Sequence, residues 1–226
     1  IKVFLDTGRQ YEITAPYHRS LGLNTPLICL NGAAIYDGRT GKALYTKPVN
    51  INEEQLFQIT NELDYNVFVH TVNGLYCKQL SVEVQSWIKE GGILPSYVGE
   101  LTHANYPTVL KYSIRSKTPC PHVSSLFKPE ATVIDWNDGF ELVAPEVSKW
   151  SAIQTLLKAY RISPLDVVTI GDGPNDVQML KGAGMGVAME NGTPEIKGVA
   201  DFVTGHHEED GFASFVERFL IDSYAL

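Results

Sequence analysis

The sequence predicts an α/β protein with a parallel-sheet core and an α+β domain inserted into that core. From Lys149 onward, apolar strand segments alternate with helical segments, which is the pattern of a parallel sheet covered by helices. Residues 1–5 form another apolar, β-rich run that suits a buried parallel strand. Between these two parts, short strands follow one another, which is typical of an antiparallel sheet.

The N-terminal part, residues 1–45, is expected to begin the core. Its helix spans residues 10–21, and Pro16 inside this segment makes the helix bounds less definite. The sequence Asp-Gly-Arg-Thr-Gly at residues 37–41 contains the residue types of a hairpin turn. The strands are expected at residues 1–5, 27–30, 34–36 and 43–45.

Residues 46–142 are predicted to form the inserted α+β domain. Its first helix spans residues 52–61, with Asn52 and Gln55 placed for a capping box. Further helices are expected at residues 82–90 and 121–127. The strands are expected at residues 66–71, 75–78, 109–114, 131–135 and 140–143.

Residues 143–226 are expected to complete the core with a regular α/β alternation. Strands separated by helices imply a parallel sheet, because a parallel connection needs a crossover. The strands are predicted at residues 166–170 and 186–189. The helices are predicted at residues 151–160, 175–181, 194–199 and 212–221.

The composition is that of an ordinary globular protein and restricts the partners. The chain has 226 residues, of which 44% are hydrophobic, and a net charge of −8. This charge argues against a nucleic-acid or anionic-membrane partner, and the three tryptophans are not interleaved with basic residues. No apolar run reaches the roughly 18 residues that cross a bilayer, and no charged-then-apolar leader is present. The abrupt start at Ile1 is expected of a fragment or a processed product.

Cys29, Cys77 and Cys120 lie far apart and form neither a Cys-x-x-Cys pair nor a disulfide framework. Idle or buried thiols in a reducing compartment, the cytoplasm, are the expectation.

The sharpest candidate site is Gly171-Asp172-Gly173-Pro174-Asn175-Asp176, directly after an apolar strand. Ligands bind at the carboxyl ends of the strands of a parallel sheet. The carboxylate and amide oxygens of this loop are of the kind that Mg²⁺ takes, and the N–H groups of the following helix suit an anion. A solvated strand-to-helix turn remains the alternative, because Gly, Asp and Asn favour turns in any case.

A second candidate is Asp6-Thr7-Gly8, also at the end of an apolar strand. A threonine hydroxyl and a glycine N–H there can hold a phosphate oxygen without adding charge. The same letters match an aspartic-protease half-site, which needs two such carboxylates on an all-β scaffold. The α/β pattern after Lys149 and the lack of a second Asp-Thr-Gly argue against the protease.

Two weaker candidates come from single residues. Lys149, just before a helix, offers a point charge to a phosphate, although a lone lysine there is usually a solvated surface group. Asn31-Gly32 mainly indicates a turn, and a ligand contact is the second interpretation. The run at residues 206–210, His-His-Glu-Glu-Asp, matches no helical ligand spacing and is expected to be an exposed loop.

Taken together, these segments resemble the haloacid dehalogenase (HAD) superfamily, in particular the Cof-type sugar-phosphate phosphatases with a large α/β cap of type IIB. The resemblance spans nearly the whole chain and rests on motifs that occur in the family's order. They are Thr7-Gly8-Arg9, Asn31-Gly32-Ala33, Val147-Ser148-Lys149, Gly171-Asp172-Gly173-Pro174-Asn175-Asp176, and a similar tail at residues 192–211. The resemblance implies a Rossmann-like core, with residues 46–142 as the cap.

The resemblance also implies roles for the candidate residues. Thr7, Gly8, Asn31, Gly32 and Asn175 would bind the phosphoryl group. Lys149, which with Thr7 would be catalytic, would neutralise the nucleophile and the phosphate. Asp172 would ligate Mg²⁺, and Asp176 would support the metal site. The implied reaction is Mg²⁺-dependent hydrolysis of a small phosphorylated metabolite through an aspartyl-phosphate, in which charge neutralisation and positioning do most of the work.

Three departures from the family pattern qualify that activity. The nucleophile motif Asp-x-Asp-Gly-Thr is expected upstream of Ile1 and occurs nowhere in the sequence, so a core strand and helix are expected to be missing. Asp6 replaces a small residue, and strand alternation would point it away from Thr7. Trp150 replaces glycine after Lys149 and is expected to crowd the phosphate site. A catalytically inactive relative that binds phosphorylated ligands or a partner, and a purely structural module, therefore stay open.

Overall fold

The computed structural model describes residues 1–221 and divides the chain into two compact units, Ile1–Ser148 and Lys149–Leu226. The division falls at Lys149, where the regular α/β alternation begins in the sequence. The prediction of a core made of residues 1–45 and 143–226 around a cap of residues 46–142 stays a prediction.

The first five residues are not the buried strand that their composition predicts. Ile1 and Val3 are exposed, and within residues 1–221 the pairing next to this segment is an isolated parallel bridge between Asp6 and Ile28. The backbone N–H of Ile28 donates to the carbonyl of Leu5, and that of Thr7 donates to the carbonyl of Ile28. The prediction was wrong because the neighbouring strand is only three residues long, too short for a regular ladder along residues 1–5.

The N-terminal helix and hairpin form as predicted. Helix α1 spans Tyr11–Ser20 with Pro16 inside it. Strand β1 (Leu27–Cys29) is fully buried and pairs antiparallel with β2 (Ala34–Tyr36), which pairs antiparallel with β3 (Ala43–Thr46). The 3₁₀ turn at Leu30–Gly32 links β1 to β2, so Asn31 and Gly32 follow the carboxyl end of a buried strand.

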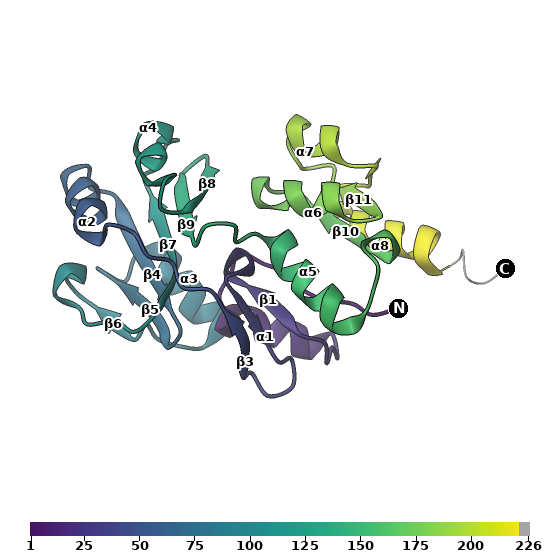
Figure 1. Cartoon of the computed structure of the whole chain (residues 1–226), viewed down its shortest axis with the longest axis horizontal. Coiled ribbons are helices and arrows are strands. Elements are labelled where there is room, and N and C mark those ends of the chain that lie inside the picture. The colour runs from purple at the N-terminus through teal and green to yellow at the C-terminus, as the bar shows by residue number, and fades with distance from the viewer. Residues whose placement is uncertain (222–226) are drawn as a thin grey trace. The chain divides into compact units, whose positions relative to one another are not determined.

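A six-stranded sheet in the order β6-β5-β4-β7-β9-β8 dominates the first unit (Figure 1). The pairs among β5, β4, β7, β9 and β8 are antiparallel, as predicted, whereas β6 runs parallel to β5. Strand β6 was not predicted, because two residues give no periodic signal. The strands are β4 (Asn66–Thr71), β5 (Gly74–Cys77), β6 (Tyr97–Val98), β7 (Val109–Arg115), β8 (Thr132–Trp136) and β9 (Gly139–Val143).

Three helices accompany this sheet: α2 (Glu53–Glu62), α3 (Val82–Gly91) and the short α4 (Pro121–Ser124), which continues as a 3₁₀ turn at Ser125–Phe127. Asn52 caps α2, since its side chain accepts from the N–H of Gln55. The N–H of Asn52 itself donates to Glu130, so the predicted reciprocal capping box is replaced by a tertiary contact. One hydrophobic cluster joins β1, α2 and the inner strands, and includes Leu27, Leu56 and Tyr112.

The second unit holds a three-stranded parallel sheet in the order β10-β11-β12. It is the parallel sheet that the sequence predicts, although the third strand was missed because it is only two residues long. Its strands are β10 (Val168–Gly171), β11 (Met185–Ala188) and β12 (Phe202–Val203). Its helices are α5 (Lys149–Tyr160), α6 (Val177–Gly182), α7 (Pro194–Val199) and α8 (Gly211–Val216), which continues as a π-helix at Glu217–Ile221. None of the helices in residues 1–221 is long and apolar enough to cross a membrane.

Candidate active site

The loop after β10 is organised around the buried carboxylate of Asp176, which is 2% exposed. One of its oxygens accepts from the Lys149 ammonium at 2.6 Å. The other accepts from the backbone N–H groups of Asp172 and Gly173, both at 2.9 Å. Charge-assisted hydrogen bonds of this kind are the strong ones, so Asp176 folds the loop back on itself and fixes its shape.

Lys149 is the first residue of α5 and is 8% exposed, which places its charge inside the unit. A buried lysine needs a carboxylate partner, because an unpaired charge away from water is very costly. The expectation of a solvated surface lysine is therefore wrong for this residue. Its pairing with Asp176 ties the start of α5 to the loop after β10.

Asp172 differs from Asp176 in that it is exposed. One of its oxygens accepts from the side-chain amide of Asn191 at 2.6 Å. Asn191 lies after the carboxyl end of β11, and its own oxygen accepts from the N–H of His207. Sequence reasoning missed Asn191, although a polar residue beyond the end of a parallel strand is the signal that identified Asp172.

This donor set fits Mg²⁺ through Asp172. Magnesium is usually held by one or two carboxylates, with waters and substrate phosphates completing its shell. Asp172 offers an exposed carboxylate, whereas both oxygens of Asp176 accept hydrogen bonds within the loop. Within residues 1–221, no three His, Cys, Asp or Glu side chains lie close enough together to hold a metal by themselves. The supporting role that the family resemblance implies for Asp176 stays a prediction.

Trp150 packs against the C-terminal end of α6. A methyl group placed on Gly182, the last residue of α6, would lie 2.2 Å from the Trp150 ring. The ring therefore covers the C-terminal end of this helix, whereas the loop of Asp172 and Asp176 leads into its N-terminal end. Within the second unit, the glycine at 182 is the partner that makes room for the tryptophan at 150.

In the first unit, Thr7 and Asn31 are joined through the backbone. The N–H of Asn31 donates to the carbonyl of Thr7 at 3.1 Å, and the Thr7 hydroxyl accepts from the N–H of Arg9, also at 3.1 Å. Leu30, Asn31 and Gly32 have consecutive positive φ angles of 54°, 58° and 96°. Such backbone is rare for a leucine and persists only where the surroundings hold it.

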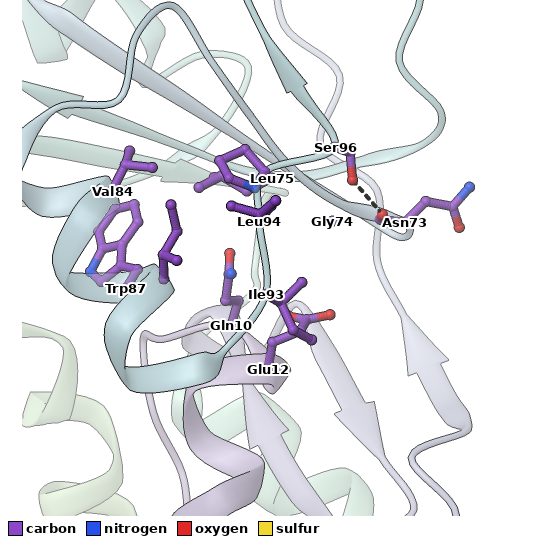
Figure 2. Close-up of a pocket in the computed structure, with 12 residues that line it drawn as sticks. Gln10, Glu12, Asn73, Gly74, Leu75, Val84, Trp87, Ile93, Leu94 and Ser96 are labelled. Carbon is purple, nitrogen blue, oxygen red and sulfur yellow. Dashed lines mark hydrogen bonds between the residues drawn. The ribbon is translucent and has the colours of Figure 1, made fainter.

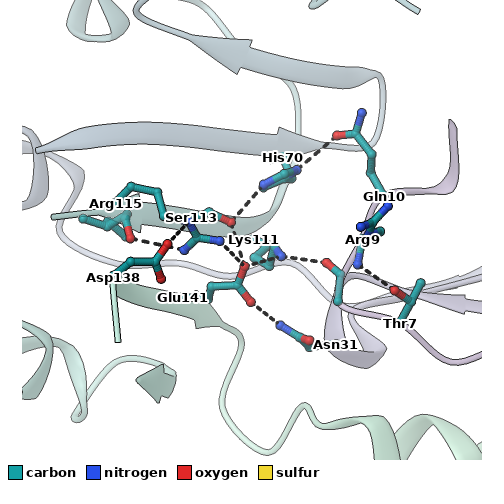
Figure 3. A network of polar contacts seen from close by, with 12 residues as sticks. Thr7, Arg9, Gln10, Asn31, His70, Lys111, Ser113, Arg115, Asp138 and Glu141 are labelled. Carbon is teal, nitrogen blue, oxygen red and sulfur yellow. Dashed lines mark hydrogen bonds and ion pairs between the residues drawn. The ribbon is translucent and has the colours of Figure 1, made fainter. Parts of the chain in front are cut away.

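A buried polar network surrounds these two loops (Figure 3). The Lys111 ammonium donates to the carbonyl of Gly8 at 2.7 Å and to the Glu141 carboxylate at 2.8 Å. Glu141 also accepts from the side-chain amide of Asn31 at 2.7 Å and from the Ser113 hydroxyl at 3.1 Å. Neither Lys111 nor Glu141 was singled out from the sequence, because each is one charged letter inside an apolar strand.

The charges of this network are fixed by burial and by one another. Burial alone would raise the pKa of Glu141, but Lys111 and Arg115, with the hydrogen bonds from Lys111 and Asn31, lower it to about 2. Burial lowers the pKa of Lys111, an effect that Glu141 opposes. Burial and the Lys111 charge lower the pKa of His70 well below its ordinary value, so its imidazole is neutral.

A pocket beside α1 is too small for a metabolite (Figure 2). It has a volume of about 60 Å³ and is lined by residues of α3, β5 and the start of α1, among them Gln10, Leu75 and Trp87. Ligand pockets for small molecules usually measure about 300–1,000 Å³. We therefore do not place a substrate there.

The chain matches a model of the haloacid dehalogenase-like hydrolases over residues 1–216. The chain belongs to this family. It is 26% identical to the 5-amino-6-(5-phospho-D-ribitylamino)uracil phosphatase of Bacillus subtilis, over 96% of this chain and 84% of that protein. It is 25% identical to the pyridoxal phosphate phosphatase of Escherichia coli, over 97% of this chain and 86% of that protein.

Solved structures of HAD proteins share the fold. A haloacid dehalogenase-like hydrolase from B. subtilis superposes with a TM-score of 0.81 at 25% identity, covering 97% of this chain and 88% of that one. A HAD subclass IIB sugar phosphatase gives a TM-score of 0.82 at 21% identity, covering 97% and 85%. The resemblance inferred from the motifs is confirmed: the chain is a member of this hydrolase family, and the relatives named here are phosphatases.

The predicted site residues of this HAD protein fall into two groups. Thr7, Gly8, Asn31 and Gly32 lie together in the first unit, and Lys149, Asp172, Asn175 and Asp176 lie together in the second. Their catalytic and binding roles stay predictions. The run at residues 206–210 forms a 3₁₀ turn at His207–Glu209, and residues 207–210 are exposed, as expected.

Replacing Gly171 by alanine should destabilise the second unit. A methyl group at this position would lie 2.5 Å from the Asp176 side chain, which cannot yield without breaking its hydrogen bonds to Lys149 and the loop. We expect a loss of about 1–3 kcal/mol in the free energy of unfolding, measured by urea denaturation. Gly198→Ala is the matched control, since nothing lies within 4 Å of that position in α7 and alanine favours helix. Equal stability of Gly171→Ala and the unmodified chain would show that Asp176 is not fixed.

The Glu141 network should make stability depend on acid pH. Because the folded pKa of Glu141 is depressed, its contribution is complete above the unfolded value and is lost as pH falls from about 4.5 toward 2. The ionised Glu141 contributes about 3 kcal/mol to the free energy of unfolding. The charged groups near it are Lys111, Arg115 and Asp138, which pairs with Arg115. Urea unfolding at several pH values should show the advantage of the unmodified chain over Glu141→Gln shrinking in this window. Parallel curves for the two proteins would contradict the assignment.

Proposed function

We propose that the chain hydrolyses small phosphate monoesters, of the sugar-phosphate type, in a Mg²⁺-dependent reaction. The observation that carries the proposal is the exposed Asp172 carboxylate beside the buried Lys149–Asp176 pair, beyond the end of a parallel strand. Family membership supports it. The relatives named above for acting on a phosphoribitylamino-uracil and on pyridoxal phosphate support a small phosphorylated metabolite as the substrate.

Each candidate residue has a chemical role in this proposal. Thr7, Gly8, Asn31 and Gly32 bind the oxygens of the phosphoryl group through neutral donors, which adds no charge to balance. Lys149 and Asn175 also bind the phosphoryl group, and the lysine lowers the cost of bringing negative groups together. Asp176 holds the Lys149 ammonium in a single position through its 2.6 Å contact. Positioning of this kind is what phosphoryl transfer requires most of a protein.

Asp172 is the residue that would ligate Mg²⁺, with Asp176 in support. The metal, when bound, neutralises negative charge on the phosphate. Asn191 orients the Asp172 carboxylate by donating to one oxygen at 2.6 Å, which is the part that outer partners play at metal sites. The family resemblance implies an aspartyl-phosphate intermediate. We assign no attacking carboxylate within residues 1–226, because no Asp-x-Asp-Gly-Thr occurs in that sequence.

We also infer that the protein is cytoplasmic and that it binds neither nucleic acid nor membranes. Cys29, Cys77 and Cys120 are free and buried, which suits a reducing compartment. The net charge of −8 disfavours polyanionic partners.

The proposal is tested by phosphate release from an aryl phosphate with and without Mg²⁺. Replacing the Asp172 carboxylate by an amide in Asp172→Asn removes the charge that binds the metal, so we expect kcat/KM to fall by about 100-fold or more. Asp166→Asn is the matched control. Asp166 is also exposed but lies before the start of β10, at the other end of the strand, so its loss should leave the rate unchanged.

Turnover that does not need Mg²⁺, or that survives Asp172→Asn, would refute the assignment of the metal to Asp172. Absence of turnover, together with Mg²⁺-dependent binding of inorganic phosphate by calorimetry, would instead favour the catalytically inactive relative that binds phosphorylated ligands. Absence of both would refute the phosphate site itself.

A further inference from the structure

A row of buried polar side chains crosses three central strands of the six-stranded sheet. His70 on β4 lies opposite Lys111 on β7, and Ser113 on β7 lies opposite Glu141 on β9. All four side chains are at most 5% exposed. Apolar residues are what the interior of a sheet normally carries, so a row of polar groups across three strands needs a reason.

This polar row contacts both loops that carry the candidate phosphate-binding residues. Lys111 donates to the Gly8 carbonyl at 2.7 Å, and Glu141 accepts from the Asn31 amide, also at 2.7 Å (Figure 3). His70 adds a contact to Gln10 at 3.2 Å, immediately before α1. The sheet therefore contacts the segment around Gly8 and the turn at Asn31 from the same side.

Lys111 and Glu141 also hold each other in place. Their charged atoms are 2.8 Å apart, and Arg115 approaches the same Glu141 oxygen at 3.6 Å. A buried ion pair of this kind is weak evidence for stability, because an apolar pair of similar size is often at least as stable. Such a pair instead fixes the orientation of its two side chains, because their hydrogen bonds form in only one arrangement.

The turn at Asn31 needs such support. Three successive residues have positive φ, and Leu30, with φ of 54°, is among them. Strained backbone persists only where contacts hold it. The Asn31 side chain is 1% exposed, and Glu141 is one of the groups that hold it there.

We propose that Lys111 and Glu141 are positioning residues for phosphoryl transfer, which hold the Gly8 and Asn31 loops at the spacing that binds the phosphate. The inference rests on the proposed function. The Lys111 ammonium is committed to Gly8 and Glu141, and the Glu141 carboxylate to Lys111 and Asn31, so the two residues act through Gly8 and Asn31. A displacement of about 1 Å in a phosphate-binding group costs on the order of 100-fold in rate, which sets the expected scale.

The test compares four variants by calorimetric affinity for inorganic phosphate in Mg²⁺ and by kcat/KM for an aryl phosphate. Lys111→Met removes the donor to Gly8, and Glu141→Gln removes the charge but keeps an acceptor for Asn31. The double variant removes both charges together, so it keeps the test valid if a single variant, with one buried charge unpaired, does not fold. Tyr112→Phe is the matched control, because Tyr112 lies between Lys111 and Ser113 on β7 but its hydroxyl contacts Glu53.

At a temperature where every variant is folded, we expect Lys111→Met and the double variant to lose about 10- to 100-fold in kcat/KM and about 10-fold in phosphate affinity. Glu141→Gln should lose less, and Tyr112→Phe should match the unmodified chain. Lower melting temperatures with unchanged phosphate affinity and kcat/KM would overturn the inference, because they would reveal a merely structural role.

The two proposals fail in different ways. If the unmodified chain binds phosphate and Asp172→Asn abolishes turnover, but the Lys111 and Glu141 variants behave like Tyr112→Phe, only the positioning role is refuted. If the unmodified chain neither binds inorganic phosphate nor releases it from the ester, the proposed function fails and the positioning role fails with it.

Discussion

A carboxylate buried away from water has to accept hydrogen bonds on several sides, and each unit of this HAD-family protein is organised around one. In the second unit, Asp176 accepts hydrogen bonds from the Lys149 ammonium and two backbone N–H groups, and these bonds fix the shape of the loop after β10. In the first unit, Glu141 accepts hydrogen bonds from Lys111, Ser113 and Asn31. In both units the partners belong to, or touch, segments that the family resemblance assigns to phosphate or metal. The free-energy cost of burying these charged groups is offset by their hydrogen bonds, and those bonds form only while the loops keep their shape.

The sequence predicted those parts of the fold whose signals are local. The parallel strand β10 (Val168–Gly171) and the loop that follows it were predicted because an apolar run ends there in glycine and acidic residues. Strands β6 and β12 were missed because two residues carry no periodicity. Residues 1–5 were predicted as a strand on their composition alone, but a strand also needs a partner of matching length, which no local pattern reveals.

The candidate site was likewise predictable where its signals are local and not where they depend on long-range contacts. Lys149 and Asp176 were singled out by their positions beside strands and helices, yet their direct ion pair was not, since it joins residues 27 apart. The contacts of Lys111 with Gly8 and of Glu141 with Asn31 span 103 and 110 residues. Such pairs depend on how the sheet is stacked against the N-terminal loops, and that arrangement is a property of tertiary packing rather than of any segment. Asn191 carries the local signal of a polar residue beyond a strand end, but its contact with Asp172 depends on the register of β11 beside β10.

The close approach of Gly171 to Asp176 links two positions that lie on either side of a tight turn. A residue with a Cβ at 171 collides with the carboxylate at 176, so position 171 admits only glycine while position 176 carries an aspartate held from three sides. If a descendant sequence exchanged Asp176 for a shorter side chain, it would remove the carboxylate that pairs with Lys149 and relax the steric demand on position 171 in the same step. The two positions should therefore vary together among sequences that keep this loop, and an alanine at 171 would indicate a chain in which the lysine has found another counter-ion.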